Sequence, residues 1–260
     1  DHRDLHSFPT RRSSDLGLDP VSVGVRTRRA MEIIKESGAD IVFLQELIPM
    51  TWDQCQVIMG NDYHLIPTPI CQYFTAILLK KTTVMLDSQR IIPFPTSQMM
   101  RKLQVVQANV KGIDLKLMNS HLESTAQHSV ERVKQLNVAL DEMTSSDPKV
   151  NVIFGGDTNL GGRDFNSIVF PENVKDLWEE LGCNGDTRYT WDTQYNDNKK
   201  MMGPGRPRCR FDRLYIRKST DENVKPVAFE LSGIERVKGC DRFPSDHWAI
   251  VAHFSIKTET

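Results

Sequence analysis

The sequence has little cysteine and no long apolar run. Its five cysteines are scattered, odd in number and never spaced as Cys-x-x-Cys, which argues against a disulfide framework and a thiolate zinc site. No apolar stretch approaches the ~20 residues that a membrane-spanning helix needs, so we expect no membrane partner. The formal net charge of −1 excludes a general attraction to polyanions, and any contact with nucleic acid must use a local patch.

The N-terminal segment differs from the rest of the chain. Residues 1–16, DHRDLHSFPTRRSSDL, show no sustained apolar periodicity and no secretory signal. We interpret them as a disordered leader or as foreign sequence, outside the fold. Residues 17–258 contain no repeat and no composition break, so they are predicted to form one domain.

Apolar periodicity predicts the main elements of that domain. Helices are expected at 27–38 and at about 126–143, the second with Val130, Val133, Leu140 and Met143 on its apolar stripe. Strands are expected at 41–44, 73–79, 103–110, 113–120, 150–156, 210–217 and 248–256. Adjacent hairpins beside interleaved helices indicate an α/β fold with a mixed, largely antiparallel sheet arrangement.

Polar side chains gather where predicted strands begin or end. They are Glu46 in IVFLQE, Asn119, His121 and Ser124 in LKLMNSHLES, Asp157 and Asn159 in NVIFGGDTN, and Asp246 and His247 in FPSDHW. Taken singly, each is more often a solvated loop residue, a structural histidine or a helix cap. Together they form an oxygen-rich set that suits Mg²⁺ and the attack of water on a phosphate ester.

Several motifs carry a family resemblance. LQE, SHLES, GGDTN, RFDR and SDH, in that order, resemble the endonuclease/exonuclease/phosphatase (deoxyribonuclease-I-like) superfamily, and YFTAILLKK, IIPFP and YTWDTQ resemble its tyrosyl-DNA phosphodiesterase branch. The resemblance covers residues 17–258 and implies a four-layer α-β-β-α sandwich of two mixed, largely antiparallel sheets. It also implies Mg²⁺, with Mn²⁺ as a substitute. The implied reaction cleaves the 5′-phosphotyrosyl bond between DNA and a trapped topoisomerase II tyrosine, leaving a 5′-phosphate for DNA repair in the nucleus and also the cytoplasm.

The resemblance also implies roles for individual residues. Asp157, with Asn159, would position or deprotonate the attacking water, Glu46 would bind the metal, and His247 would contact the phosphate while Asp212 orients it. Substrate contacts would come from His121, Leu122, Glu123, Ser124, Thr125, Leu160, Tyr73, Trp191, Phe211 and Asp246. Two alternatives stay open at this point: Asp212 could instead pair with Arg210 or Arg213, and the aromatic residues could be core.

One segment is strongly basic. Residues 199–218 carry eight basic side chains against one acidic side chain. Such a loop could gather a DNA backbone. The alternative is a solvated turn between strands.

The chain departs from the family pattern at its first motif. The family's first strand ends in Trp-Asn-Ile-Asp-Gly-Leu, whereas this chain has Ser13, Ser14, Asp15 and Leu16 before Gly17. The missing asparagine and the shifted aspartate predict a weakened metal and phosphate site. Two alternatives follow: another phosphodiesterase of the superfamily, such as an abasic endonuclease, a deadenylase or a phospholipid phosphodiesterase, or a catalytically impaired module that binds DNA or a protein partner.

Overall fold

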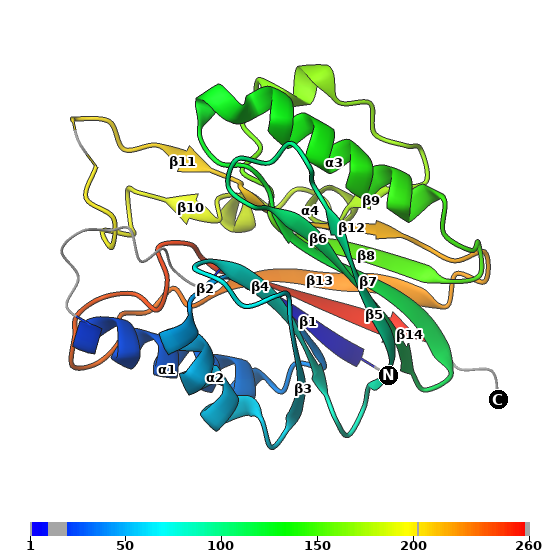
Figure 1. The fold of residues 1–260 in the computed structure, drawn as a ribbon, viewed down its shortest axis with the longest axis horizontal. Coiled ribbons are helices and arrows are strands. Elements are labelled where there is room, and N and C mark those ends of the chain that lie inside the picture. The colour runs from blue at the N-terminus through cyan, green and yellow to red at the C-terminus, as the bar shows by residue number, and fades with distance from the viewer. Residues whose placement is uncertain (1, 10–19, 202, 258–260) are drawn as a thin grey trace.

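Two six-stranded sheets pack face to face in the computed structural model, which describes residues 2–9, 20–201 and 203–257 (Figure 1). The first sheet has the order β13 (Val224–Ser232), β14 (Ala249–Ile256), β1 (His2–Pro9), β2 (Ile41–Leu47), β4 (Phe74–Lys80) and β3 (Tyr63–Pro67). The second has the order β5 (Met85–Pro93), β6 (Lys102–Val110), β7 (Ile113–His121), β8 (Asn151–Asp157), β12 (Asp212–Arg217) and β9 (Lys175–Asp176).

Helices cover the outer face of each sheet. In Figure 1, α1 (Pro20–Ser37) and α2 (Pro49–Met59) lie below the first sheet, and α3 (Ser129–Thr144) lies above the second. The short elements are α4 (Leu177–Glu180), the 3-10 turns η1 (Ala126–His128), η2 (Asp164–Ser167) and η3 (Gly185–Thr187), and a two-stranded ribbon of β10 (Trp191–Asp192) and β11 (Arg208–Cys209). The predicted four-layer α-β-β-α sandwich is confirmed.

Strand β2 shows why its sequence is a continuous apolar run. Ile41 and Phe43 face the core between the two sheets, while Val42 and Leu44 face the core under α1 and α2. Successive side chains of a strand point to opposite faces, so a strand covered on both sides needs apolar residues at every position. Each sheet has one parallel pair, β1–β2 and β7–β8, and its other pairs are antiparallel, as the mixed arrangement predicts.

Residues 2–9, which we interpreted as part of a segment outside the fold, lie within the first sheet. His2–Pro9 form β1, which pairs antiparallel with β14 and parallel with β2. A strand between two others gains backbone hydrogen bonds on both edges, and these do not depend on apolar periodicity. The first-motif positions, Ser13 to Gly17, lie outside the described residues.

The apolar stripe predicted for the second helix is partly wrong. Leu140 and Met143 of α3 are buried, but Val130 is 71% exposed. The buried face continues instead through Leu136 and Ala139. The prediction also missed α2, β3, β5 and β13. Among the helices that the structure describes, none combines the length and apolar character that crossing a membrane requires. All five cysteines are free thiols.

Candidate active site

Three neighbouring strands of the second sheet place three polar side chains in one row. Strand β8 pairs in register with β7 on one side and β12 on the other, so that Asp157 lies opposite both His121 and Asp212. His121 Nε2 is 3.4 Å from Asp157 Oδ2. His121 and Asp212 are 36 and 55 positions away from Asp157 in the chain, and only the strand register brings the three residues together.

A glycine permits this close register. Gly156 has φ +137°, and a Cβ atom built there would lie 1.9 Å from the backbone oxygen of Ser120 on β7. Any side chain would push the two strands apart, since real Cβ atoms do not approach a carbonyl oxygen that closely. The second glycine of the GGD sequence is therefore required by the spacing that places Asp157 beside His121.

Asp157 and Asn159 form a tight turn at the end of β8. The backbone N–H of Asn159 donates to Asp157 Oδ1 over 2.9 Å, and Asn159 has φ 51°, a left-handed conformation that asparagine tolerates. The Asn159 side chain also donates to the carbonyl of Leu122 over 3.2 Å. Burial, followed by the negative charge of Asp212, raises the pKa of Asp157 to about 6.

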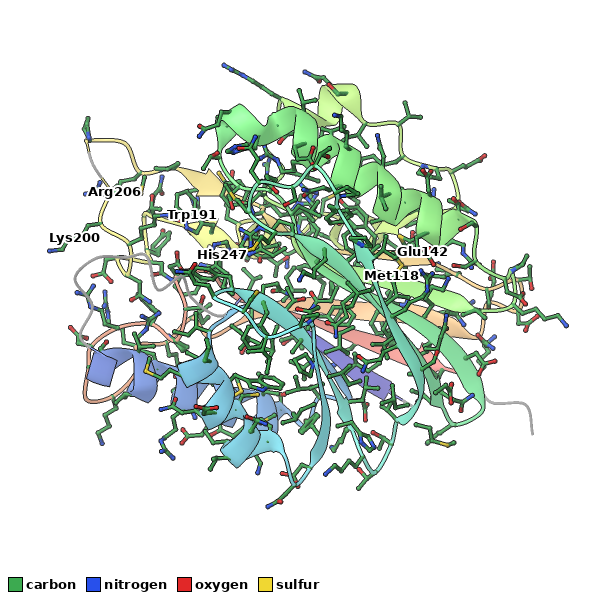
Figure 2. All side chains as sticks on the ribbon, in the orientation of Figure 1. Met118, Glu142, Trp191, Lys200, Arg206 and His247 are labelled. Carbon is green, nitrogen blue, oxygen red and sulfur yellow. The ribbon has the colours of Figure 1, made fainter. Side chains whose placement is uncertain are left out.

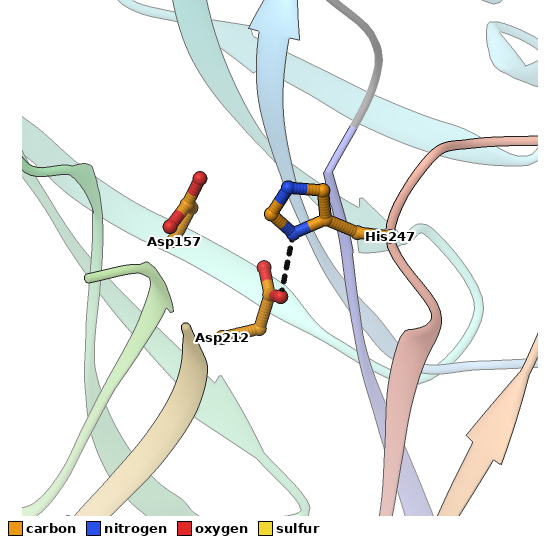
Figure 3. A group of neighbouring side chains, drawn as sticks. All are labelled: Asp157, Asp212 and His247. Atoms are coloured by element: carbon orange, nitrogen blue, oxygen red, sulfur yellow. Dashed lines mark hydrogen bonds and ion pairs between the residues drawn. The ribbon is translucent and has the colours of Figure 1, made fainter. Parts of the chain in front are cut away.

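Asp212 orients His247. Asp212 Oδ2 accepts a hydrogen bond from His247 Nδ1 over 2.8 Å, and the carboxylate has no solvent exposure (Figure 3). Burial disfavours a charged imidazole, but the charge and hydrogen bond of Asp212 outweigh it and raise the pKa of His247 to about 10. Arg210 and Arg213 instead pair with Asp176, so the alternative salt-bridge interpretation of Asp212 is wrong.

Glu46 approaches from the first sheet. Its Oε1 is 3.7 Å from His121 Nδ1, which links it to the row on the second sheet. Glu46 has φ 58°, at an irregularity in the β2–β4 pairing between Leu44 and Leu47. The preceding Gln45 donates to Asn119 of β7 over 2.8 Å, a buried hydrogen bond that joins the two sheets next to Glu46.

The donor set fits a hard divalent cation at Glu46 better than at the histidine. One atom each of Asp157, Asp212 and His247 lie within 4.8 Å of one another, a spacing that could hold a metal (Figure 3). The Nδ1 atom of His247 already donates to Asp212, however, and a protonated imidazole cannot be a ligand. Glu46 is half-buried and lines a small groove with Tyr73, so water has access to it. Mg²⁺ favours one or two carboxylates with several waters.

Arg101 is a component of the site that the sequence did not reveal. Its guanidinium lies 3.0 Å from His121 Nδ1 and donates to Ser124 Oγ over 3.2 Å. No sequence pattern distinguishes it, since a loop arginine is common in any soluble protein. Its contact with His121 places a positive charge beside the carboxylates of Glu46 and Asp157.

Aromatic side chains border the row. Trp191 and Phe211 have ring centroids 5.5 Å apart, and each centroid lies about 6.5 Å from that of His247. Trp191 is 9% exposed and Phe211 is half-buried, so Trp191 contributes to packing as well as to the edge of the site. Tyr73 lines the groove beside Glu46. These predicted contact residues do lie around the site.

The side chains of three predicted substrate contacts are buried. Leu122 and Leu160 are buried in the core between β8 and α3. Glu123 is fully buried and accepts hydrogen bonds from Ser97 Oγ, Gln135 Nε2 and the backbone N–H groups of residues 98 and 99. Leu122 directly follows His121, and adjacent side chains of an extended segment point in opposite directions. Glu123 lies beyond the end of β7, where its own hydrogen bonds hold it in the core.

The remaining predicted contacts lie at the margin. Ser124 is buried, and Arg101 donates to it. Thr125 is exposed, with its hydroxyl 2.9 Å from His128 Nδ1, and is directed to a local turn. Asp246 is half-buried beside His247, and its negative charge adds to the rise in the pKa of His247.

The basic segment is less available than its composition suggests. Five of its eight cationic side chains form ion pairs or buried hydrogen bonds within the protein. These are Arg208, Arg210, Arg213, Arg217 and Lys218. Lys200 and Arg206 are exposed on the outer loop beyond Trp191 and His247 (Figure 2). The charge available to a phosphate backbone is therefore confined to the tip of this loop.

The fold and the site define the class of protein. The chain belongs to the Endonuclease/Exonuclease/phosphatase family, whose sequence model matches residues 16–247. It is similar to "Tyrosyl-DNA phosphodiesterase 2" of Xenopus tropicalis, with 42% identity over 242 residues, 92% of this chain and 64% of that protein. The chain thus spans just under two thirds of the length of that relative.

Solved structures show the same likeness. The crystal structure of D. rerio TDP2 complexed with single strand DNA product has a TM-score of 0.90 and 38% identity, and the match covers 98% of this chain and 99% of that chain. TDP2 from C. elegans has a TM-score of 0.84 and 36% identity, covering 98% of this chain and 75% of the other. A Bacteroides thetaiotaomicron protein of the family, 13% identical with a TM-score of 0.76, shares the fold.

Proposed function

We propose that the chain is a divalent-metal-dependent phosphodiesterase that hydrolyses the 5′-phosphotyrosyl bond between DNA and a topoisomerase II remnant. The observation that carries this proposal is the row of His121, Asp157 and Asp212, with His247 beside it. The names of the similar proteins support the tyrosyl-DNA substrate, and one similar structure was solved with a single-strand DNA product. Asp157, Asn159, Asp212, His247 and Glu46 are the proposed functional groups.

Asp157 and Asn159 would hold the attacking water. The turn between them fixes both side chains near the end of β8. A carboxylate with a pKa of about 6 is a stronger base than an ordinary aspartate, although it is still ionised at neutral pH. As the water oxygen bonds to phosphorus, its proton passes to Asp157 and the bond from phosphorus to the tyrosine oxygen breaks.

His247 would stabilise the phosphoryl group. With a pKa of about 10, its imidazole carries a positive charge at neutral pH. Its Nδ1 donates to Asp212, which leaves Nε2–H to donate to a non-bridging phosphate oxygen. The charge that grows on the phosphoryl oxygens in the transition state would strengthen this hydrogen bond. Arg101 and His121 would provide further donors.

A phenol leaving group suits these functional groups. Tyrosine has a pKa near 10, far below that of a sugar hydroxyl, so it can depart as a phenolate without a strong acid. The phenolate then takes a proton from solvent, and DNA keeps a 5′-phosphate for repair. Glu46 would hold Mg²⁺, with Mn²⁺ as a substitute, and the cation would neutralise phosphate charge.

DNA would enter along the aromatic border. Trp191, Phe211 and Tyr73 lie around the site, and base stacking on such rings is sequence-tolerant. Lys200 and Arg206 would reach the backbone from the loop tip. We further propose a nuclear location, with the cytoplasm as a second one, because the substrate is damaged DNA.

The test is release of tyrosine from a 5′-phosphotyrosyl oligonucleotide in Mg²⁺, with abasic and poly(A) substrates in parallel. We expect cleavage of the phosphotyrosyl substrate by the parent chain and at least about a 10³-fold loss in Asp157→Ala. Asp221→Asn, on an exposed turn, is the matched control. Preference for the abasic or poly(A) substrate, or full activity in Asp157→Ala, would refute the proposal.

A further inference from the structure

A second cavity lies on the outer face of the second sheet. Its volume is about 480 Å³, and it is bordered by η2, the following loop, β9, α4 and β12. Cavities of a few hundred Å³ are the usual size for small-molecule sites. Leu214 and Ile216 of β12 face the core between the sheets, whereas Tyr215 faces outward with α3. Asp212 has the inward parity, so the cavity is separate from the candidate active site.

The cavity has aromatic walls. Phe165, Phe170 and Tyr215 all line it. Phe170 stacks on Tyr215 with ring centroids 5.6 Å apart, and Phe165 stacks on Phe170 with centroids 6.1 Å apart. Phe165 and Phe170 remain half-buried, which leaves part of each ring facing the cavity. Such walls favour a flat aromatic molecule over an aliphatic one.

A buried polar group at the base of the cavity lacks a hydrogen-bond partner. Among the described residues, the hydroxyl of Tyr215 has no partner. Tyr215 lines the cavity and is 1% exposed. Burial raises the pKa of Tyr215, which keeps the phenol protonated. The Tyr215 hydroxyl is a hydrogen-bond donor, so an acceptor oxygen in the cavity would satisfy it.

The charges around the cavity balance. Asp176 and Glu179 pair with Arg210 and Arg213, and Glu180 pairs with Lys218. Glu172 and Lys175 line the cavity without an ion pair in the part of the chain that the structure describes, and they offset each other. The cavity therefore offers no surplus of positive charge to a phosphate or another polyanion, and no surplus of negative charge to an organic cation.

We propose that this cavity binds a neutral, flat aromatic group that carries a carbonyl or phenolic oxygen. The ring lies against Phe165 and Phe170, and its oxygen accepts a hydrogen bond from the Tyr215 hydroxyl. Two sources supply this chemistry: a small aromatic amide or phenol, and a tyrosine side chain of a polypeptide. The proposal is independent of the proposed phosphodiesterase function.

Benzamide is the first probe, because it is neutral and flat and has one carbonyl oxygen. Benzamide is titrated into the full chain, and binding is followed by NMR of labelled Phe and Tyr rings. Two analogues are titrated in parallel: cyclohexanecarboxamide, which is not flat, and benzylamine, which is cationic. We expect benzamide to saturate with a millimolar Kd, as its nine heavy atoms allow. This Kd should be at least about fivefold lower than the Kd of either analogue.

Variants locate the binding. Tyr215→Phe keeps the ring and removes the hydroxyl, and it should weaken benzamide at least about fivefold. Tyr63→Phe is the matched control, since the buried Tyr63 hydroxyl donates to the Ala39 carbonyl in the first sheet. Phosphodiesterase activity should be unchanged in Tyr215→Phe, so failure here is distinguishable from failure of the proposed function. Equal binding of the three probes, or unchanged affinity in Tyr215→Phe, would overturn the proposal.

N-acetyl-tyrosinamide, which carries a tyrosine side chain, distinguishes between the two sources of the ligand. Tighter binding of this probe than of benzamide, lost in Tyr215→Phe, supports a polypeptide side chain as the occupant. Tighter binding of benzamide, with the same loss, supports a free small molecule. No saturation by either probe at about 20 mM, far above a millimolar Kd, would reject the site altogether.

Discussion

Asp212 Oδ2 accepts a hydrogen bond from His247 Nδ1 over 2.8 Å, while the other oxygen of Asp212 is buried without a partner among the described residues. Thr190 secures both sides of this contact: its hydroxyl accepts from the Asp212 N–H, and its carbonyl accepts from the N–H of Trp248. A buried carboxylate with an unused oxygen is costly unless a positive charge stays beside it. The pair is therefore held in the ionised state of both partners.

Asp212→Asn should lower the pKa of His247 from about 10 towards its ordinary value of 6.5, because the charge that offsets burial is gone. At pH 8 the imidazole would be neutral, and kcat/KM should fall at least about 100-fold. NMR titration of the His247 ring measures the pKa, and initial rates measure kcat/KM. A histidine that stays charged at pH 8 in the variant would contradict this account.

The same pair predicts a pH dependence of stability. The folded pKa of His247 lies above its unfolded value, so its contribution is fully present below pH 6.5 and is lost as pH rises through about 10. The parent chain should lose on the order of 3 kcal/mol in the free energy of unfolding between pH 7 and 10 from this group. Urea unfolding of the parent chain and Asp212→Asn should show that loss in the parent chain only.

Asp157→Asn should stabilise the metal-free protein while abolishing turnover. The folded pKa of Asp157, about 6, is also raised, so its stabilising contribution is present below about pH 3.8 and is lost as pH rises through 6. In EDTA at pH 8 the variant should unfold with a free energy higher by about 1–3 kcal/mol, and the difference should shrink towards pH 4.5. Equal stability of the two proteins at pH 8 would show that the ionised Asp157 carboxylate does not destabilise the fold.

Glu46→Gln should raise the Mg²⁺ concentration for half-maximal activity at least about tenfold, because an amide oxygen is a weaker ligand than a carboxylate. EDTA should abolish activity of the parent chain, and Mg²⁺ or Mn²⁺ should restore it. The Mg²⁺-dependent rise in Tm gives a second readout without turnover. Glu32→Gln, on the partly exposed face of α1, is the control and should respond to Mg²⁺ as the parent chain does.

Glu123→Ala should destabilise the protein rather than affect substrate directly. Burial opposes its charge, but hydrogen bonds from Ser97, Gln135 and two backbone N–H groups outweigh it and lower the pKa of Glu123. Its removal leaves these donors unpaired and should cost about 3 kcal/mol in the free energy of unfolding. The loss should be largest near pH 7 and should diminish as pH falls below about 4.5. Urea unfolding measures it, and a fully stable variant with raised KM would restore the substrate role.

Sequence patterns predicted the mixed sheet arrangement and the polar groups at strand ends because both leave local signals. Strands such as β2 and β8 are buried on both faces, so their apolar runs are continuous, and Glu46 and Asp157 stand where those runs end. The edge strands β5 and β13 were missed because most of their side chains are exposed or partly exposed. Strand β1 was missed because its place depends on backbone pairing with β2 and β14.

The order of motifs along the chain, by itself, determined which residues are chemically suited to a phosphate ester and a hard cation. Only the tertiary structure decided which side chains of each motif reach the site: His121 does, while its near neighbour Glu123 turns into the core. It also decided that Arg101 belongs there and that most of the basic segment does not. The physical reason is that facing, register and ion pairing depend on contacts between segments distant in the chain, and no local pattern encodes those contacts.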